Sequence, residues 1–290
     1  MNLFNSLYYW LPLAKLLGLF PFLTKNDTIF FSKRILTLNI FWNILIFSWF
    51  IIYIILKKSQ KSIFHPDSLF RILNYFLILT VIFINLFVIL YRNVLIQLFN
   101  ELNDLLLSKR SYLFIRRFLC PLDLTFIIYI FYSLLFFRRI YLIIRYIFLY
   151  ICNFHIHLAI TIYISILLLM KCEFRRINKK LDNISLERNN RLVQIKKINA
   201  LQQRHLKLFQ ITGKINSYLS LNLLFILAIF VFNMIINYNL FIFQNEKYDW
   251  IFLVEVNILT LILTFKILCI ITIADSTSSE VSVKYFCCLK

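Results

Sequence analysis

The sequence predicts an all-α, polytopic membrane protein: a helix bundle of six transmembrane helices with a cytoplasmic N-terminus. Of the 290 residues, 61% are hydrophobic and only 16% are charged, whereas about 25% of a soluble domain is charged. Long apolar segments recur along the chain, and the basic residues gather between them. A soluble fold of this length could not hide so much apolar surface, so we expect lipid to be its solvent.

Two segments are the clearest spans, because 35–56 and 72–91 contain no charged residue. A helix needs about 20 apolar residues to cross the hydrocarbon, and both segments meet that length. The other predicted spans are 118–137, 146–170, 215–245 and 250–274. Backbone amides in lipid must pair within their own segment, which predicts helices for all six. We therefore expect one transmembrane domain over residues 1–290.

Orientation follows from the Lys and Arg count in the connections. Segments 1–34, 92–117 and 171–214 together contain 21 of these residues, whereas the alternate connections contain eight. Cytoplasmic connections are enriched in Lys and Arg, so the N-terminus is predicted to be cytoplasmic. The same distribution argues against nucleic acid as a partner, because the positive charge marks topology rather than one binding face.

The segment 171–214 predicts a helical extension in the cytoplasm. Two apolar stripes recur at three- to four-residue spacing. They are Phe174, Ile177, Leu181 and Ile184, and then Leu192, Ile195, Ile198 and Leu201. Asn189 and Asn190 lie between them at a plausible turn. The alternative is a solvated basic loop.

Enzymatic chemistry finds no support in the sequence. With only two glycines, the chain has no nucleophile elbow, P-loop or dinucleotide fingerprint, and it has no HExxH pair. His155 and His157 are two residues apart, so on a straight helix they point about 200° apart and cannot share one metal ion. We expect no catalytic residue, no metal site and no cofactor.

Polar residues inside the spans are better candidates, because burying them in lipid is costly and they usually face the bundle interior. The candidate ligand-pocket residues are His155, Asn233, Asn237, Glu255 and Asn257. The four Asn and Glu residues fall in the outer half of the predicted bundle, close to His155 at mid-depth, and the cluster could line a cavity that opens outward. Hydrogen bonding between helices is an equally good explanation. Lys266, in the last predicted span, is expected to extend its ammonium to the inner surface.

Four segments resemble motifs of the insect gustatory receptor family. They are Trp10–Phe22 (WLPLAKLLGLFPF), Lys171–Leu181 (KCEFRRINKKL), Arg204–Asn216 (RHLKLFQITGKIN) and Ala274–Val281 (ADSTSSEV). The motif positions are Gly18, Pro21, Arg204, His205, Asn216 and Glu280. The third segment, a basic residue and His followed by a Leu-rich turn and an Asn, is the most similar. The four occur in family order along the whole chain.

This resemblance implies a multi-pass receptor in the plasma membrane of chemosensory neurons. Family members are ligand-gated cation channels, assembled as homo- or hetero-tetramers, that detect small-molecule tastants. The resemblance also implies a seventh, pore-lining helix with a Thr-Tyr motif followed by Gln-Phe. The sequence ends at Lys290, about 16 residues past the sixth span. We therefore expect a C-terminally truncated receptor that does not conduct alone.

Three alternatives stay open. An odorant receptor of the same superfamily shares the topology, although the Leu-Leu-Gly-Leu-Phe-Pro opening favours the gustatory branch. A secondary transporter would have repeats and Gly- or Pro-broken helices near the midplane, which this sequence lacks. A membrane scaffold without receptor activity is the third. The ligand itself is not specified by the sequence.

Overall fold

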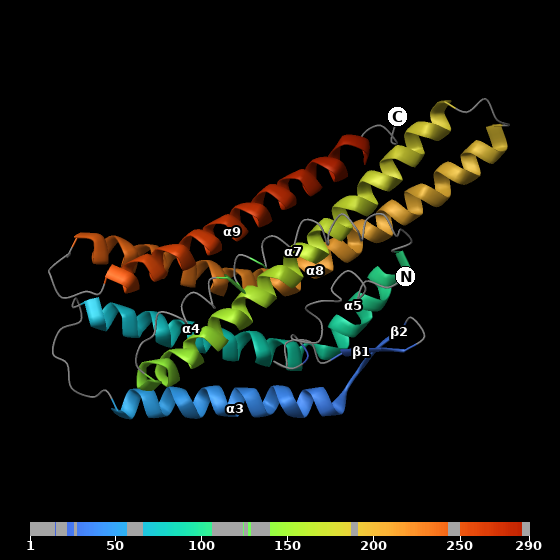
Figure 1. The fold of residues 1–290 in the computed structure, drawn as a ribbon. Coiled ribbons are helices and arrows are strands. Elements are labelled where there is room, and N and C mark those ends of the chain that lie inside the picture. The colour runs from blue at the N-terminus through green and yellow to red at the C-terminus, as the bar shows by residue number, and fades with distance from the viewer. Residues whose placement is uncertain are drawn as a thin grey trace.

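A computed structural model describes residues 15, 22–25, 28–56, 66–105, 124, 127–128, 140–186, 191–242 and 250–285. Within these residues the chain is almost entirely helical (Figure 1). The elements are β1 (Phe22–Lys25), β2 (Thr28–Phe31), α3 (Lys33–Leu56), α4 (Pro66–Leu90), α5 (Arg92–Leu105), α7 (Ile140–Leu186), α8 (Arg191–Ile242) and α9 (Trp250–Tyr285). The predicted all-α helix bundle is confirmed.

Helix α7 lies at the centre of the bundle and packs against α4, α8 and α9 (Figure 1). Its middle is buried almost all round: Ile156, Leu158, Ile160 and Ile164 are at most 2% exposed. A helix that is apolar on every side belongs inside a bundle. Its sequence therefore accounts for its central position, and α3 packs farther out, against α4.

Helices α7 and α8 are too long to consist only of membrane-spanning segments. They contain 47 and 52 residues, which at 1.5 Å per residue gives roughly 70–80 Å. The hydrocarbon is only ~30 Å thick. The yellow and gold ends of the two helices accordingly run side by side past the rest of the bundle (Figure 1). This projecting pair contains residues 171–186 of α7 and 191–214 of α8, where the sequence predicts amphipathic helices.

Large apolar side chains on the outside of the bundle indicate contact with lipid. On α9, four of them follow one face at helical spacing: Leu261, Phe265, Leu268 and Ile271, all more than half exposed. Exposed apolar surface of this extent is unusual in a soluble monomer. Segments Ile151–Ile184, Arg191–Phe232 and Thr260–Val281 are each long and apolar enough to cross a membrane. The third predicted span, 118–137, lies outside the described residues except for positions 124, 127 and 128.

Two elements were not expected from the sequence. One is the antiparallel pair β1–β2, in which Phe22 is opposite Phe31. The other is α5, which follows α4 after a bend of 74° and lies in the segment 92–117, predicted only as a basic connection. Its apolar residues Leu95, Leu98, Phe99 and Leu102 have one-face spacing and are buried. That pattern was a usable signal for a helix.

The second apolar stripe differs from its prediction. Leu192 and Ile195 are 70% and 53% exposed, so they pack against nothing within the described part of the chain that would cover them. The buried face of α8 begins later and consists of His205, Leu208, Ile211 and Ile215. The first stripe behaves as predicted, since Phe174, Ile177 and Ile184 are all buried. The later half of the second stripe is closer to its prediction, since Ile198 and Leu201 are half-buried and Leu201 packs against the core.

Candidate functional site

Three segments that are distant in sequence meet where the helix extensions leave the bundle. They are residues 173–178 of α7, the region of Arg204 on α8 and the last turns of α9 around Glu280. We call this the polar junction. Each segment belongs to one of the motifs identified in the sequence, so three of the four motifs are neighbours in space.

Glu173 is the buried acid of the polar junction, with its side chain only 2% exposed. Its carboxylate lies 3.4 Å from Nη2 of Arg204 on α8 and 3.7 Å from Nη1 of Arg176, one turn along α7. Burial raises the pKa of this carboxyl, and the charges of Arg176, Arg204 and Lys180 act against that rise. A buried carboxylate is stable only when paired, so Glu173 ties α8 to α7.

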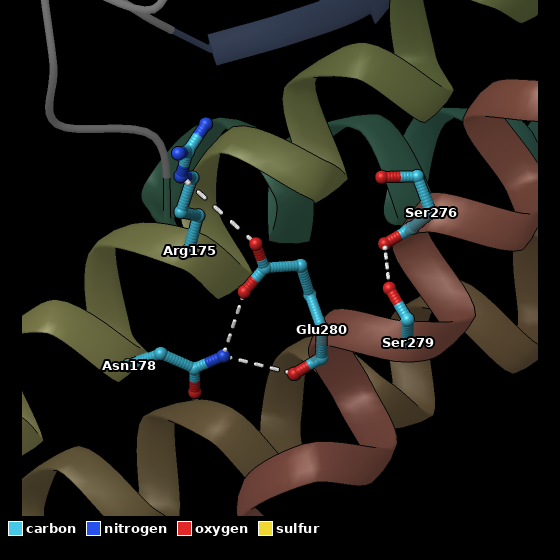
Figure 2. A network of polar contacts seen from close by, with 5 residues as sticks. All are labelled: Arg175, Asn178, Ser276, Ser279 and Glu280. Carbon is cyan, nitrogen blue, oxygen red and sulfur yellow. Dashed lines mark hydrogen bonds and ion pairs between the residues drawn. The ribbon is translucent and has the colours of Figure 1, made fainter.

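Glu280 connects α9 to the same stretch of α7 (Figure 2). The side-chain amide of Asn178 donates to the backbone oxygen of Glu280 at 2.9 Å and to its carboxylate at 3.0 Å. Nε of Arg175 lies 3.9 Å from the other carboxylate oxygen, but this Arg side chain is 63% exposed. Asn178 is 5% exposed, so its two hydrogen bonds fix the C-terminal part of α9 more strongly than the exposed ion pair does.

His205 packs beside the ion pairs of the polar junction. Its ring meets the ring of Phe174 edge-on, with 5.1 Å between the ring centroids. His205 is only 6% exposed. Burial lowers the pKa of His205, which favours a neutral ring near pH 7. Of the other motif positions, Asn216 is exposed on α8. Gly18 and Pro21 lie outside the described residues.

A second polar cluster lies inside the bundle, between α7 and α9. The Lys266 ammonium donates to Oγ1 of Thr161 at 2.8 Å, and its Nζ atom is 2.9 Å from Nε2 of His157. Lys266 is completely buried and His157 is 1% exposed. The expectation that Lys266 extends to the membrane surface is therefore wrong. Its position on α9 faces α7, and polar acceptors there hold the ammonium inside.

The sequence contained a signal for this cluster. His157, Thr161 and Ser165 are four residues apart, so they form a polar stripe on one face of α7. Thr161 also donates to the carbonyl of His157 at 2.9 Å, and Ser165 to that of Thr161 at 2.7 Å. An ammonium can only donate, so Nε2 of His157 must accept and the ring proton must lie on Nδ1.

The five predicted ligand-pocket residues are placed only in part. His155 is fully buried: its Nδ1 donates to the carbonyl of Ile151 at 3.2 Å, and its ring meets Trp42 of α3 edge-on. Asn257 lies exposed on α9. Asn233 and Asn237 belong to α8 and Glu255 to α9, but the side chains of these three lie outside the described part. Their grouping into one pocket stays a prediction.

Groups of His, Cys, Asp or Glu that could bind a metal ion do not occur among the described residues. The chemistry that the clusters offer is ionic pairing and hydrogen bonding, together with proton uptake by His205 at low pH. Fold and clusters together define a multi-pass membrane protein whose polar groups join its helices.

Comparison with known proteins identifies that class more closely. Residues 7–283 match the family described as 7tm Chemosensory receptor. The match covers almost the whole chain, and the chain belongs to this family. Its members are receptors, generally without enzymatic activity. Comparison with curated proteins gives no match. The resemblance inferred from the four sequence motifs is thereby confirmed at the level of the chemoreceptor family.

Proposed function

We propose that this chemosensory receptor is a gustatory receptor, a ligand-gated cation channel subunit that detects small-molecule tastants. The single observation that supports a receptor is the family match over residues 7–283. The Gly18 and Pro21 opening supports the gustatory branch. The proposed location is the plasma membrane of chemosensory neurons, with the N-terminus in the cytoplasm and a homo- or hetero-tetramer as the working assembly.

The proposed tastant site is the outer cluster of His155, Asn233, Asn237, Glu255 and Asn257. An ionised side chain such as Glu255 is costly in lipid and needs a partner or a water-filled cavity. Sites for small molecules are mostly apolar, with a few polar groups that orient the ligand. The proposed cluster fits that description, because it places three Asn amides and the Glu255 carboxylate among apolar helices.

Helix α9 provides a mechanical route from the proposed site to the polar junction. It is 36 residues long and contains Glu255 and Asn257 near its start and Glu280 near its end. A shift of α9 on ligand binding would act on Asn178 and Arg175 of α7 through their contacts with Glu280. Gating of this kind needs two arrangements of the junction with different ligand affinity.

Current recordings in cells that co-express the chain with related receptors test this function. Tastants should evoke cation currents, and Asn237→Leu or Glu255→Leu should move the dose–response curve. Asn199→Leu, at an exposed position of α8 outside the four motifs, is the matched control and should leave the curve in place. Currents evoked by volatile odorants and by no tastant would assign the chain to the odorant branch. Responses that ignore both pocket substitutions would refute the proposed site.

Subunit counting by stepwise photobleaching of labelled receptors tests the assembly, with four steps per particle expected. Single-step particles at the plasma membrane would contradict a tetramer.

A further inference from the structure

A partly open hollow of about 80 Å³ lies between α4, α5, α7 and α8. Its walls come from segments 84–88, 95–99, 159–166 and 219–226 of these four helices. The segments of α4, α7 and α8 all lie within predicted spans, and α5 follows directly on the end of α4. The hollow therefore lies within the depth of the bilayer, and the medium that reaches its opening is lipid.

The walls of the hollow are almost wholly apolar. The side-chain oxygen of Asn222, on the α8 side, is buried and is not accessible from the hollow. Cavities lined by aliphatic and aromatic side chains take up apolar groups, and one water needs only about 10–15 Å³, so there is room for roughly five to eight non-hydrogen atoms. That is the size of part of an acyl chain, whereas the fused rings of a sterol are larger.

Helix α5 indicates at which level of the bilayer the hollow lies. It leaves α4 after a bend of 74°, so it runs close to the membrane plane if α4 crosses the membrane. It is also amphipathic: Leu98 and Leu102 are buried, whereas Asn93 and Gln97 are exposed. An amphipathic helix in this orientation lies at the boundary between headgroups and acyl chains. The hollow under α5 is therefore level with the first carbons of the chains.

A cation lies next to the hollow at the headgroup level. Arg92 is exposed at the start of α5, one helical turn before Leu95 of the wall. Its guanidinium lies over the ring of Phe31, 5.2 Å from the centroid. A guanidinium stacked on a ring can still present its N–H groups to a phosphate. The ammonium of Lys214 on α8 is already paired with Glu101 at 3.5 Å, which makes Arg92 the better phosphate ligand.

We propose that the hollow holds the first carbons of one acyl chain of a phospholipid, whose phosphate binds to Arg92. The lipid belongs to the leaflet on the side of the helix extensions. It contacts both arms of the α4–α5 bend and the central helix α7, so it fills the space that the bend creates. The site adds a structural lipid to the protein and does not depend on what binds at the outer cluster.

Photolabelling of the full-length chain in lipid nanodiscs tests the proposal directly. The probe is a phosphatidylglycerol with a diazirine early in one acyl chain, and the matched probe is a diacylglycerol with the same chains but no phosphate. Label from the first probe on segments 159–166 and 219–226 should saturate as the probe fraction rises. Label on the exposed face of α9, at Leu261 and Phe265, should rise in proportion to the probe, because bulk lipid exchanges there.

The phosphate contact is measured by comparing the two probes. Half-saturation should need about fivefold more of the diacylglycerol, the factor expected from one basic side chain near the membrane surface. Arg92→Gln should remove this difference between the probes. Equal half-saturation of the two probes in the wild-type chain would refute the assignment of the phosphate to Arg92.

Two further variants separate the hollow from other lipid contacts. Ala159→Phe fills the hollow and should abolish the saturable label, whereas Leu268→Phe adds a ring on the exposed face of α9 and should leave it unchanged. Label in the wild-type chain that is confined to the exposed faces, or that never saturates on the hollow segments, would overturn the proposal without any variant. Displacement of the saturable label by excess sterol would overturn it in favour of a sterol. None of these readouts uses a current, so they succeed or fail independently of the proposed channel function.

Discussion

The Nζ atom of Lys266 on α9 lies 2.9 Å from Nε2 of His157 on α7, and both side chains are buried in the bundle. An ammonium at this depth depends on its acceptors, because burying a charge without partners is far more costly than burying an apolar side chain. The contact therefore specifies how α9 is seated on α7. We therefore expect the protein to tolerate replacement of Lys266 by an apolar residue better than replacement of His157.

We expect His157→Leu to destabilise the protein more than Lys266→Met. The first leaves a buried ammonium with one acceptor fewer, at a cost of about 1–3 kcal/mol, whereas the second removes the charge itself. The double variant should be more stable than His157→Leu alone. Thermal unfolding of the purified protein in detergent, followed by intrinsic fluorescence, measures all three. Equal losses for the two single variants would mean that Lys266 does not rely on His157.

The ion pair of Glu173 with Arg204 should contribute measurably to stability. Glu173→Gln removes the buried charge to which Arg176 and Arg204 are paired, and we expect a loss of about 1–3 kcal/mol. Arg175→Gln is the control in the same junction, because its pairing with Glu280 is largely exposed and should contribute about 0–1 kcal/mol. The melting temperatures of the two variants, compared with that of the wild-type protein, measure the two losses of stability. A larger loss for Arg175→Gln would contradict the assignment.

Acidification should weaken the packing of His205 on α7. Burial lowers the pKa of His205 below its ordinary 6.5, so the unfolded chain takes up the proton first as pH falls. The contribution of His205 to stability is complete above pH 6.5 and is lost as pH falls below that value toward the folded pKa. The raised pKa of Glu173 acts in the opposite direction, since the folded state binds that proton more readily.

Melting curves at pH 7.5 and about pH 5.5 measure this effect, with His205→Gln as the reference that cannot titrate. The wild-type chain should lose more stability on acidification than the variant does. If both lose the same amount, another group is responsible for the pH dependence.

The helix extensions should depend on the apolar stripe of α7. We expect the paired change Ile177→Asp and Leu181→Asp to disturb the α7–α8 packing, lower surface expression and raise protease sensitivity. Ile177 is 2% exposed, so its replacement places a charge where water is excluded. The matched control is Leu192→Asp with Ile195→Asp, two charges at exposed positions of α8, which should be tolerated. Normal surface amounts for the first pair would show that the packing is not needed.

The orientation proposed from the charge distribution predicts that both glycosylation sequons face the cytoplasm. These are Asn26-Asp-Thr28 and Asn183-Ile-Ser185, and neither should be modified. Gel mobility before and after glycosidase treatment is the measurement. A sequon engineered into the connection 246–249 serves as the positive control, since it is expected on the outer side. A glycosidase-sensitive band for the natural sequence would reverse the orientation.

The sequence by itself determined the kind of molecule and where five of its six described helices fall, α5 being the exception. Apolar length and low charge require helices in lipid whatever their neighbours are, which is why α3, α4, α7, α8 and α9 contain predicted spans. The apolar face of α7 that contains Phe174 and Ile177 could likewise be predicted, because the spacing of its residues depends on one helix only. Four short motifs were enough to indicate the chemoreceptor family.

Only the tertiary structure decided which polar residues meet. Lys266 could satisfy its charge at the membrane surface or inside the bundle, and the rotation of α9 against α7 selects His157 and Thr161. The bend between α4 and α5 and the pairing of Asn178 with Glu280 depend in the same way on segments far apart in sequence. Spacing along one helix specifies a face, but the partner of that face is set by how several helices pack at once.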